Sequence, residues 1–316
     1  MMQQFEELLA HAKHIVLIVP ENPDADALGS ASALYSYMLQ KHKKVSFFCN
    51  STTIKRRYKF IAWVEKIRNN LPAGGELFIA CGVQSLEGNG ISIKRPTINI
   101  DNDPSNTVYG ELNIIDASAL SITTVVYDLL QKAKAKINAK MATALYAGIV
   151  EKSDMFQKSD VNGMTFAFAK ELLDYGALHA EVVKYLQKYS TLSQLRLIGK
   201  MLESMRLVES AQIALFYVDR ALLLHTGAEL EDTQEALERA LWLPSVRMSV
   251  AIVERKAGGY TLLFRSDEEE LLKIAAVFGA DAKTEYAVCE LLEPLSAEEI
   301  QKKILQEVKK IEKKEK

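Results

Sequence analysis

Asp24 and Asp26 stand two residues apart in a place where α/β proteins often position chemistry. The apolar run 15–19 predicts a buried strand, Pro20 ends it, and a helical pattern begins a few residues later. Open α/β sheets bind ligands at the carboxyl ends of their strands, so the aspartate pair suits a divalent metal ion. An equally good interpretation is structural, with Asp26 as the helix N-cap and Asp24 shaping the turn.

The segment 22–30, NPDADALGS, resembles the first motif of the DHH phosphoesterase superfamily, which includes RecJ-like exonucleases and nanoRNase/pAp phosphatases. Members hydrolyse phosphodiesters or phosphomonoesters with two divalent metals, commonly manganese, between a DHH domain and a smaller DHHA1 domain. Further motifs follow in the family's order up to about residue 290. The resemblance implies an α/β fold, with a parallel-sheet DHH-type domain that has helices on both faces and a smaller α/β DHHA1-type domain.

Five positions that bind metal in the family carry other residues in this chain. By resemblance, Pro20 stands in place of a ligand histidine and Ala80 in place of the aspartate that bridges both metals. Asn102 and Asp103 replace the two histidines of the D-H-H signature, and Lys152 replaces the last metal-binding aspartate. Two-metal hydrolysis needs ligands that hold both cations about 3.5 to 4 Å apart. We therefore expect a degenerate phosphoesterase-like protein, a pseudoenzyme without the family's dinuclear site.

Asp24, Asp26 and Asp101 are the acidic positions that the chain retains. Together with Asp103 they could hold one magnesium or manganese ion, because hard cations accept oxygen ligands. The ammonium group of Lys152 only donates hydrogen bonds and would repel a cation. Inside the cleft it would offset the carboxylate charges; a solvent-facing lysine is the equal alternative. We expect no cofactor, with Mn²⁺ or Mg²⁺ only if the altered site is active.

The second part of the chain resembles a DHHA1 domain around Arg265 and Ser266. In the family, this pair is followed by a glycine-rich loop that contacts the phosphate or base of the substrate. Here the loop from Gly279 to Lys283 carries side chains at the glycine positions. Arg265, Ser266, Gly279 and Lys283 are our candidate ligand-binding residues; for Arg265 a surface arginine on a strand is an equal alternative.

The segment 55–60, KRRYKF, interleaves basic and aromatic residues and could touch phosphates. A solvated basic face over a core stripe is the more common meaning of such a pattern. The net charge of the chain is −2, but residues 301–316 carry seven lysines and three glutamates, so the rest is acidic. That balance disfavours long DNA or RNA as a partner.

The 316 residues, 48% of them hydrophobic, can form two cores. We expect a DHH-type domain over 1–187, a helical connector over 188–206, a DHHA1-type domain over 207–296 and a charged helix over 297–316. Apolar runs are too short to cross a bilayer, no leader pattern is visible, and three scattered cysteines favour neither disulfides nor a zinc site. These features predict a cytoplasmic protein without membrane partners.

Three functions remain open from the sequence. The favoured one is binding of a phosphorylated small molecule, a nucleotide or a protein partner by a scaffold that has lost metal-dependent hydrolysis. The second is an active phosphoesterase with an atypical metal site, acting on short oligonucleotides or pAp. The third is a structural or assembly protein, for example a homodimer, that uses the charged C-terminal helix.

Overall fold

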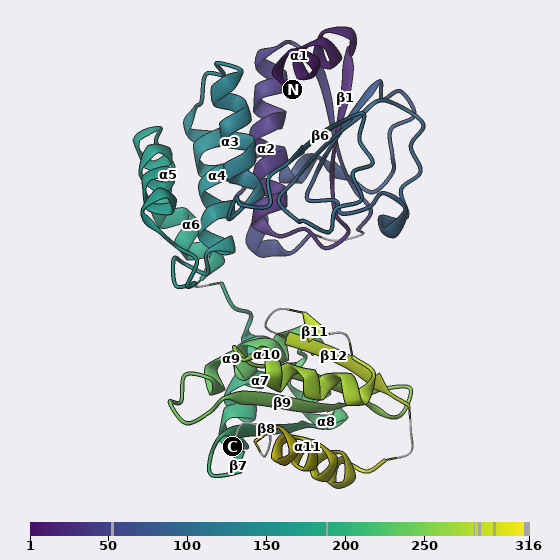
Figure 1. The fold of residues 1–316 in the computed structure, drawn as a ribbon, viewed down its shortest axis with the longest axis vertical. Helices are drawn as coiled ribbons and strands as arrows, with labels where there is room; N and C mark the ends of the chain where they lie inside the picture. Colours follow the sequence, from purple (N-terminus) through teal and green to yellow (C-terminus); the bar gives the residue numbers. More distant parts are fainter. Residues whose placement is uncertain (52–53, 188, 281, 284–285, 293–294, 313–316) are drawn as a thin grey trace. The chain divides into compact units, whose positions relative to one another are not determined.

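The computed structural model describes residues 1–51, 54–187, 189–280, 282–283, 286–292 and 295–312 (Figure 1). The chain divides into two compact units, Met1–Tyr189 and Ser190–Lys316. Each unit has its own six-stranded sheet and its own buried apolar clusters. The α/β fold class that the sequence predicts is confirmed.

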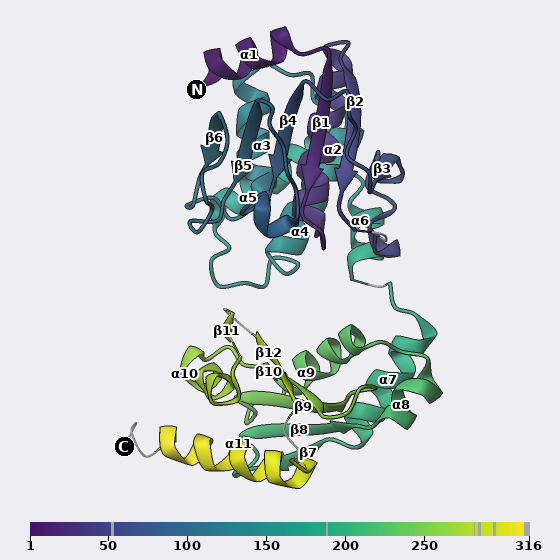
Figure 2. The same cartoon turned by 90° about the vertical axis from the view of Figure 1, so that its right-hand side faces the viewer.

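The first unit is built on a parallel sheet in the order β3-β2-β1-β4-β5-β6 (Figure 2). Strand β1 lies in the middle, β2 and β3 follow on one side, and β4, β5 and β6 follow on the other, which is the order of a doubly wound sheet. Such a sheet has a crevice at the carboxyl ends of its middle strands. The strands are β1 (His14–Val19), β2 (Lys44–Cys49), β3 (Ile67–Arg68), β4 (Leu77–Cys81), β5 (Thr97–Asp101) and β6 (Leu112–Ile115).

Helices cover one face of this sheet, and irregular chain with one short 3-10 helix covers the other. The helical face holds the largest apolar cluster, whereas Val16, Ile18 and Ala80 pack on the second face under the segment around η3 (Glu87–Asn89). This second face differs from the expected two helical layers. The remaining helices are α1 (Met2–His11), α2 (Ala25–Gln40), η1 (Arg56–Tyr58), η2 (Val64–Lys66), α3 (Ile122–Lys132), α4 (Ala139–Lys152), α5 (Gly163–Asp174) and α6 (His179–Leu186).

Two glycines bring the helices of the first unit close enough to form the candidate site. A Cβ on Gly29 of α2 would lie 2.2 Å from the carbonyl oxygen of Ala144 on α4. A Cβ on Gly148 of α4 would lie 2.3 Å from the Thr123 side chain and 3.0 Å from the Cα of Asp26. Only glycine permits backbone contact of this kind. The start of α2, the start of α3 and the end of α4 therefore converge around Asp26.

The second unit has a mixed sheet in the order β11-β12-β10-β9-β8-β7, in which only β8 and β9 are parallel. Gly258 and Gly259, with φ of 90° and 75°, form the turn that joins β9 to β10. The strands are β7 (Arg206–Val208), β8 (Ile213–Val218), β9 (Met248–Glu254), β10 (Tyr260–Arg265), β11 (Ala282–Lys283) and β12 (Tyr286–Leu291). The helices are α7 (Leu192–Glu203), α8 (Arg220–Thr226), η4 (Leu230–Thr233), α9 (Gln234–Ala240), α10 (Glu269–Leu272), η5 (Lys273–Phe278) and α11 (Ala297–Glu312).

Two segments that we assigned outside the DHHA1-type domain pack inside the second unit. Helix α7, within the predicted connector, buries Leu197 and Met201 in one apolar cluster of this unit. Helix α11, the predicted charged tail, buries Ile300 and Ile304 in another. In the described part of the chain, no helix is long and apolar enough to span a membrane.

Candidate functional site

Asp24 and Asp26 lie at the start of α2, where the sequence predicts them, but our structural interpretation named the wrong residue as the N-cap. Asp24, not Asp26, is the N-cap: its Oδ1 accepts a hydrogen bond from the Ala27 amide at 2.9 Å. Asp26, only 1% exposed, accepts one from the Ile122 amide and one from the Thr123 amide, each at 2.8 Å. The Asp26 carboxylate thus joins α2 to the positive end of the α3 dipole.

The electrostatics of Asp26 reflect its depth. Burial and the neighbouring charge of Asp24 raise the pKa of Asp26 to about 7. The two amide groups and the ammonium of Lys152 oppose that rise. Lys152 is half-buried at the end of α4, and its charge acts on Asp26.

Glu151, which the sequence analysis passed over in favour of Lys152, makes more contacts at this centre than its neighbour. Its Oε2 accepts from the Ala25 amide at 2.5 Å, and its Oε1 accepts from the Arg57 guanidinium at 3.0 Å and the Tyr58 hydroxyl at 2.9 Å. Burial raises the pKa of Glu151, and Arg57 opposes the rise. The sequence pointed to this contact only through the basic segment 55–60, which contains Arg57 and Tyr58. No local spacing pairs that segment with Glu151, because the two are more than 90 residues apart.

Asp101 lies at the end of β5, and hydrogen bonds engage both of its oxygens. Oδ1 accepts from the amides of Asn102 and Asp103 at 2.8 and 3.2 Å, and Oδ2 accepts from the Asn106 side chain at 2.7 Å. The Asn102 amide group donates to the Ala119 carbonyl at 2.9 Å. The Asp103 carboxylate accepts from the backbone and hydroxyl of Ser105. These residues fold the loop after β5 onto itself.

Ala80 and Pro20 contribute nothing to this centre. Side chains alternate along a strand, and Ala80 is fully buried in the apolar cluster on the sheet face away from α2. The position that faces the helix termini is Gly82, where a Cβ would lie 2.6 Å from Ile122 and 3.5 Å from Ala27. We therefore correct Ala80 to Gly82 as the site position after β4. Pro20 is half-buried, and its carbonyl accepts a hydrogen bond from Cys49.

The donor set does not fit a two-metal centre. Both oxygens of Asp26 and both of Asp101 accept N–H groups, which leaves each with less capacity for a cation. Among the residues that the structure describes, no group of three or more histidine, cysteine, aspartate or glutamate side chains is arranged to hold a metal ion. Among the described residues, Asp24 and Asp26 lie at the start of α2, and Asp101 and Asp103 lie at the end of β5 and in the loop after it.

In the second unit, the four candidate ligand residues differ in what they do. Ser266 is buried, donates to the Arg247 carbonyl at 2.8 Å and accepts from the Glu268 amide at 3.0 Å. Gly279 ends η5 with a φ of 79°, and Lys283 lies in the short strand β11. Ser266 and Gly279 thus shape the backbone around them.

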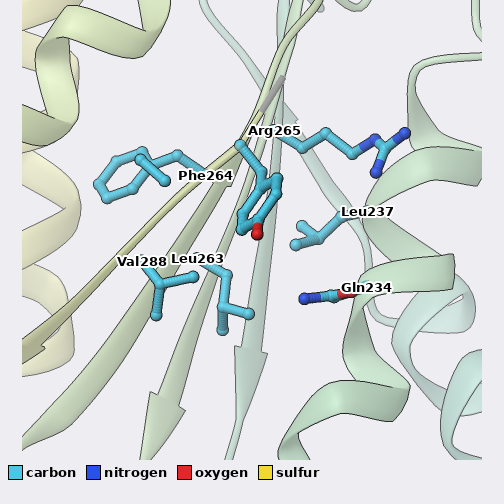
Figure 3. Close-up of a pocket in the computed structure, with 8 residues that line it drawn as sticks. Gln234, Leu237, Leu263, Phe264, Arg265 and Val288 are labelled. Carbon is cyan, nitrogen blue, oxygen red and sulfur yellow. The ribbon is translucent and has the colours of Figure 1, made fainter. Parts of the chain in front are cut away.

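Arg265 lines a small pocket between α9 and the end of the sheet (Figure 3). Gln234 and Leu237 of α9 form one wall, and Leu263 and Val288 of the sheet form the floor. The guanidinium lies 3.9 Å from the Glu238 carboxylate, which offsets part of its charge. Among the described side chains of these candidates, that of Arg265 is the one that lines this pocket.

Residues 14–149 match the sequence model described as "DHH family, N-terminal domain". The first unit therefore carries the N-terminal domain of the DHH family. The chain is 27% identical over 202 residues to the bifunctional oligoribonuclease and PAP phosphatase NrnA of Thermus thermophilus, which covers 63% of this chain and 61% of that protein. It is 28% identical over 211 residues to the protein of the same name from Bacillus subtilis, covering 64% and 66%. The match thus spans just under two thirds of each relative.

Solved structures show the same DHH fold. An exopolyphosphatase-related protein from Bacteroides fragilis superposes with a TM-score of 0.87 at 17% identity, covering 98% of this chain and 97% of that one. The exonuclease RecJ bound to manganese superposes with a TM-score of 0.51 at 12% identity, covering 96% and 92%. At these identities the likeness concerns the fold alone.

Proposed function

We propose that this DHH-superfamily protein binds a phosphorylated nucleotide or short oligonucleotide and lacks two-metal hydrolysis. The observation that carries the proposal is the engagement of Asp26 and Asp101, whose four carboxylate oxygens all accept N–H groups. Carboxylates that accept backbone and side-chain N–H groups hold the fold together. Two-metal hydrolysis would instead need carboxylate oxygens that hold two cations around one water molecule.

Positive side chains take the electrostatic place of metals in this proposal. Arg57 bonds to Glu151, its charge also interacts with Asp24, and the charge of Lys152 acts on Asp26. Repulsion among crowded carboxylates is reduced by opposite charge, whether a metal ion or a side chain supplies it. The centre is therefore stable without a divalent ion.

The ligand class in the proposal comes from the family. The relatives are named as oligoribonucleases and PAP phosphatases, and both names describe phosphorylated nucleotide substrates. A protein partner is the other ligand that the sequence favours. The assembly hypothesis gains less support, because α11 uses its apolar side chains Ile300, Ile304 and Val308 within its own unit.

The second candidate function is an active metal-dependent phosphoesterase with an altered site. The relatives' names favour it. So does Asp24, which is half-exposed and of whose two oxygens only Oδ1 accepts a hydrogen bond within the described residues. Turnover that requires Mn²⁺ and disappears in Asp24→Asn would establish this candidate in place of the first.

The test is calorimetric titration of metal-stripped protein with Mn²⁺, together with hydrolysis assays on pAp and a short oligoribonucleotide. We expect no saturable binding of two ions, no turnover, and binding of the intact nucleotide in metal-free buffer. Two bound ions with turnover would overturn the proposal. Absence of both hydrolysis and nucleotide binding would leave a protein partner as the ligand.

A further inference from the structure

Three aromatic rings form a row on the surface of the first unit, between the segment after η1 and helix α6. Phe60 stacks on Tyr185 with ring centroids 5.1 Å apart and planes 8° apart. Tyr185 in turn lies against Tyr189, at 6.1 Å and 32°. We call Phe60, Tyr185 and Tyr189 the ring row. It joins residues that are far apart in the sequence, and so no local pattern predicts it.

The outer end of the ring row is not part of the core. Phe60 packs against the edge of the main apolar cluster, which explains why it is buried in part. Tyr189 is 39% exposed and belongs to none of the apolar clusters of the unit. Packing against the main apolar cluster therefore accounts for Phe60, whereas the exposed part of the Tyr189 ring is not explained by core packing.

Exposed cations lie on the two segments that carry the ring row. Lys55, Arg56 and Lys59 are exposed on the η1 side, and Lys184 is exposed on α6 with its Nζ 5.5 Å from the Tyr185 ring centroid. None of these four forms an ion pair with another described residue. A group of unpaired cations on an otherwise acidic chain is a local electrostatic feature, and it attracts anions.

The same segment reaches the centre described above. Arg57 and Tyr58 of η1 bond to Glu151, while their neighbours Arg56 and Lys59 point to solvent. The segment 55–60 thus connects the centre, through Arg57 and Tyr58, with the ring row, through Phe60.

We propose that the ring row and its four cations form a binding platform for a short single-stranded oligonucleotide. Bases stack on aromatic rings regardless of sequence, while lysine and arginine hold the phosphates. Tyr189 offers the free ring, and Lys55, Arg56, Lys59 and Lys184 offer the charges. The choice of a nucleotide over another aromatic anion rests on the proposed function.

The experiment uses the full chain and an adenine oligoribonucleotide of about five nucleotides, labelled with fluorescein, in metal-free buffer with anisotropy as the readout. Tyr189→Leu should weaken binding about tenfold, since one stacked base is lost. Tyr189→Phe should bind like the wild type, because the ring and not the hydroxyl makes the contact. The matched control is Tyr175→Leu, which removes a tyrosine of similar exposure, 42%, beside α5.

A second pair of variants tests the charges. Arg56→Gln with Lys59→Gln should weaken binding at low salt and flatten its salt dependence, because fewer counterions are released. Lys132→Gln with Lys136→Gln removes two exposed lysines elsewhere on the unit and should leave both unchanged. Salt dependence is a readout that a merely structural role of the segment would not move.

The outcomes separate this platform from the proposed function. Wild-type binding that is equal in Tyr189→Leu and Tyr175→Leu, with unchanged salt dependence in Arg56→Gln/Lys59→Gln, would overturn the platform and leave nucleotide binding elsewhere intact. Absence of oligonucleotide binding by a wild type that still binds pAp would overturn the platform alone, and absence of binding to either ligand would overturn both. Tyr189 lies outside the core, so Tyr189→Leu is expected to fold, and its melting temperature checks this.

Discussion

The altered centre and the ring row both carry charged side chains, yet they use them in opposite ways. At the centre, Asp26 and Asp101 are buried, and each oxygen accepts a hydrogen bond from the protein. At the ring row, Arg56 and Lys59 are exposed and contact no described carboxylate within ion-pair distance. A motif residue whose polar atoms all bond within the protein, such as Asp26, serves the fold. An exposed cation that forms no ion pair with a described carboxylate, such as Arg56, is available to a ligand.

Asp26 offers the largest test of this comparison. Replacing it by alanine leaves the Ile122 and Thr123 amides at the start of α3 without acceptors, which should lower the free energy of unfolding by about 3 kcal/mol. Asp26→Asn keeps one acceptor and should cost less. Urea unfolding followed by circular dichroism measures both.

The control for Asp26 is Asp103→Ala, which removes a half-buried loop carboxylate that, among the described residues, bonds to Ser105 alone. We expect a loss below about 1 kcal/mol. Equal losses in Asp26→Ala and Asp103→Ala would show that the buried carboxylate does not hold the two helices together.

Removing the positive charges of Arg57 and Lys152 should give the next largest effect, on the binding of Mn²⁺. Arg57→Gln combined with Lys152→Gln removes two positive charges beside Asp24, Asp26 and Glu151, so Mn²⁺ binding should become measurable where the wild type shows none. Calorimetry on metal-stripped protein measures the change.

Arg57→Lys serves as its control, because it keeps the charge and should leave Mn²⁺ affinity at the wild-type level. If the double glutamine variant binds Mn²⁺ no better than the wild type, these side chains do not take the electrostatic place of metal ions.

Ser266 extends the comparison to the second unit. Its buried hydroxyl bonds to the Arg247 carbonyl and the Glu268 amide, so Ser266, like Asp26, is a motif residue whose polar atoms bond within the protein. Ser266→Ala should lower the free energy of unfolding by about 1 kcal/mol and leave nucleotide affinity unchanged. Ser245→Ala, at an exposed serine, should change neither. A loss of affinity without a loss of stability would place Ser266 in a ligand site.

The ion pair between Arg247 and Glu268 should give the smallest effect. The hydrogen bond from Arg247 holds the pKa of Glu268 below its usual range, so its contribution is present at neutral pH and is lost as the pH falls through the lowered value. The Glu268 side chain is 41% exposed, which limits the effect to a few tenths of a kcal/mol. Urea unfolding at neutral pH and about pH 3.5 should show this loss in the wild type and not in Glu268→Gln. An equal change in the free energy of unfolding between the two pH values in both proteins would contradict this prediction.

The sequence by itself determined the DHH-family resemblance of residues 14–149, the α/β class and most of the elements that carry the motifs. The periodicity of the apolar residues places β1 before Asp24, and the family motifs appear in order along the chain. These are local features, because a strand followed by a turn and a helix is encoded by neighbouring residues. The replaced positions Asn102, Asp103 and Lys152 are likewise read directly from the chain.

Only the tertiary structure decided what those residues contact. The bond from Arg57 to Glu151 joins positions 94 residues apart, and the carboxylate of Asp26 meets an amide 96 residues away. The face of a strand to which a side chain points depends on its register in the sheet, which moved the site position from Ala80 to Gly82. Such pairings arise when distant segments pack, and no local spacing specifies them. The ring row of Phe60, Tyr185 and Tyr189 has the same origin.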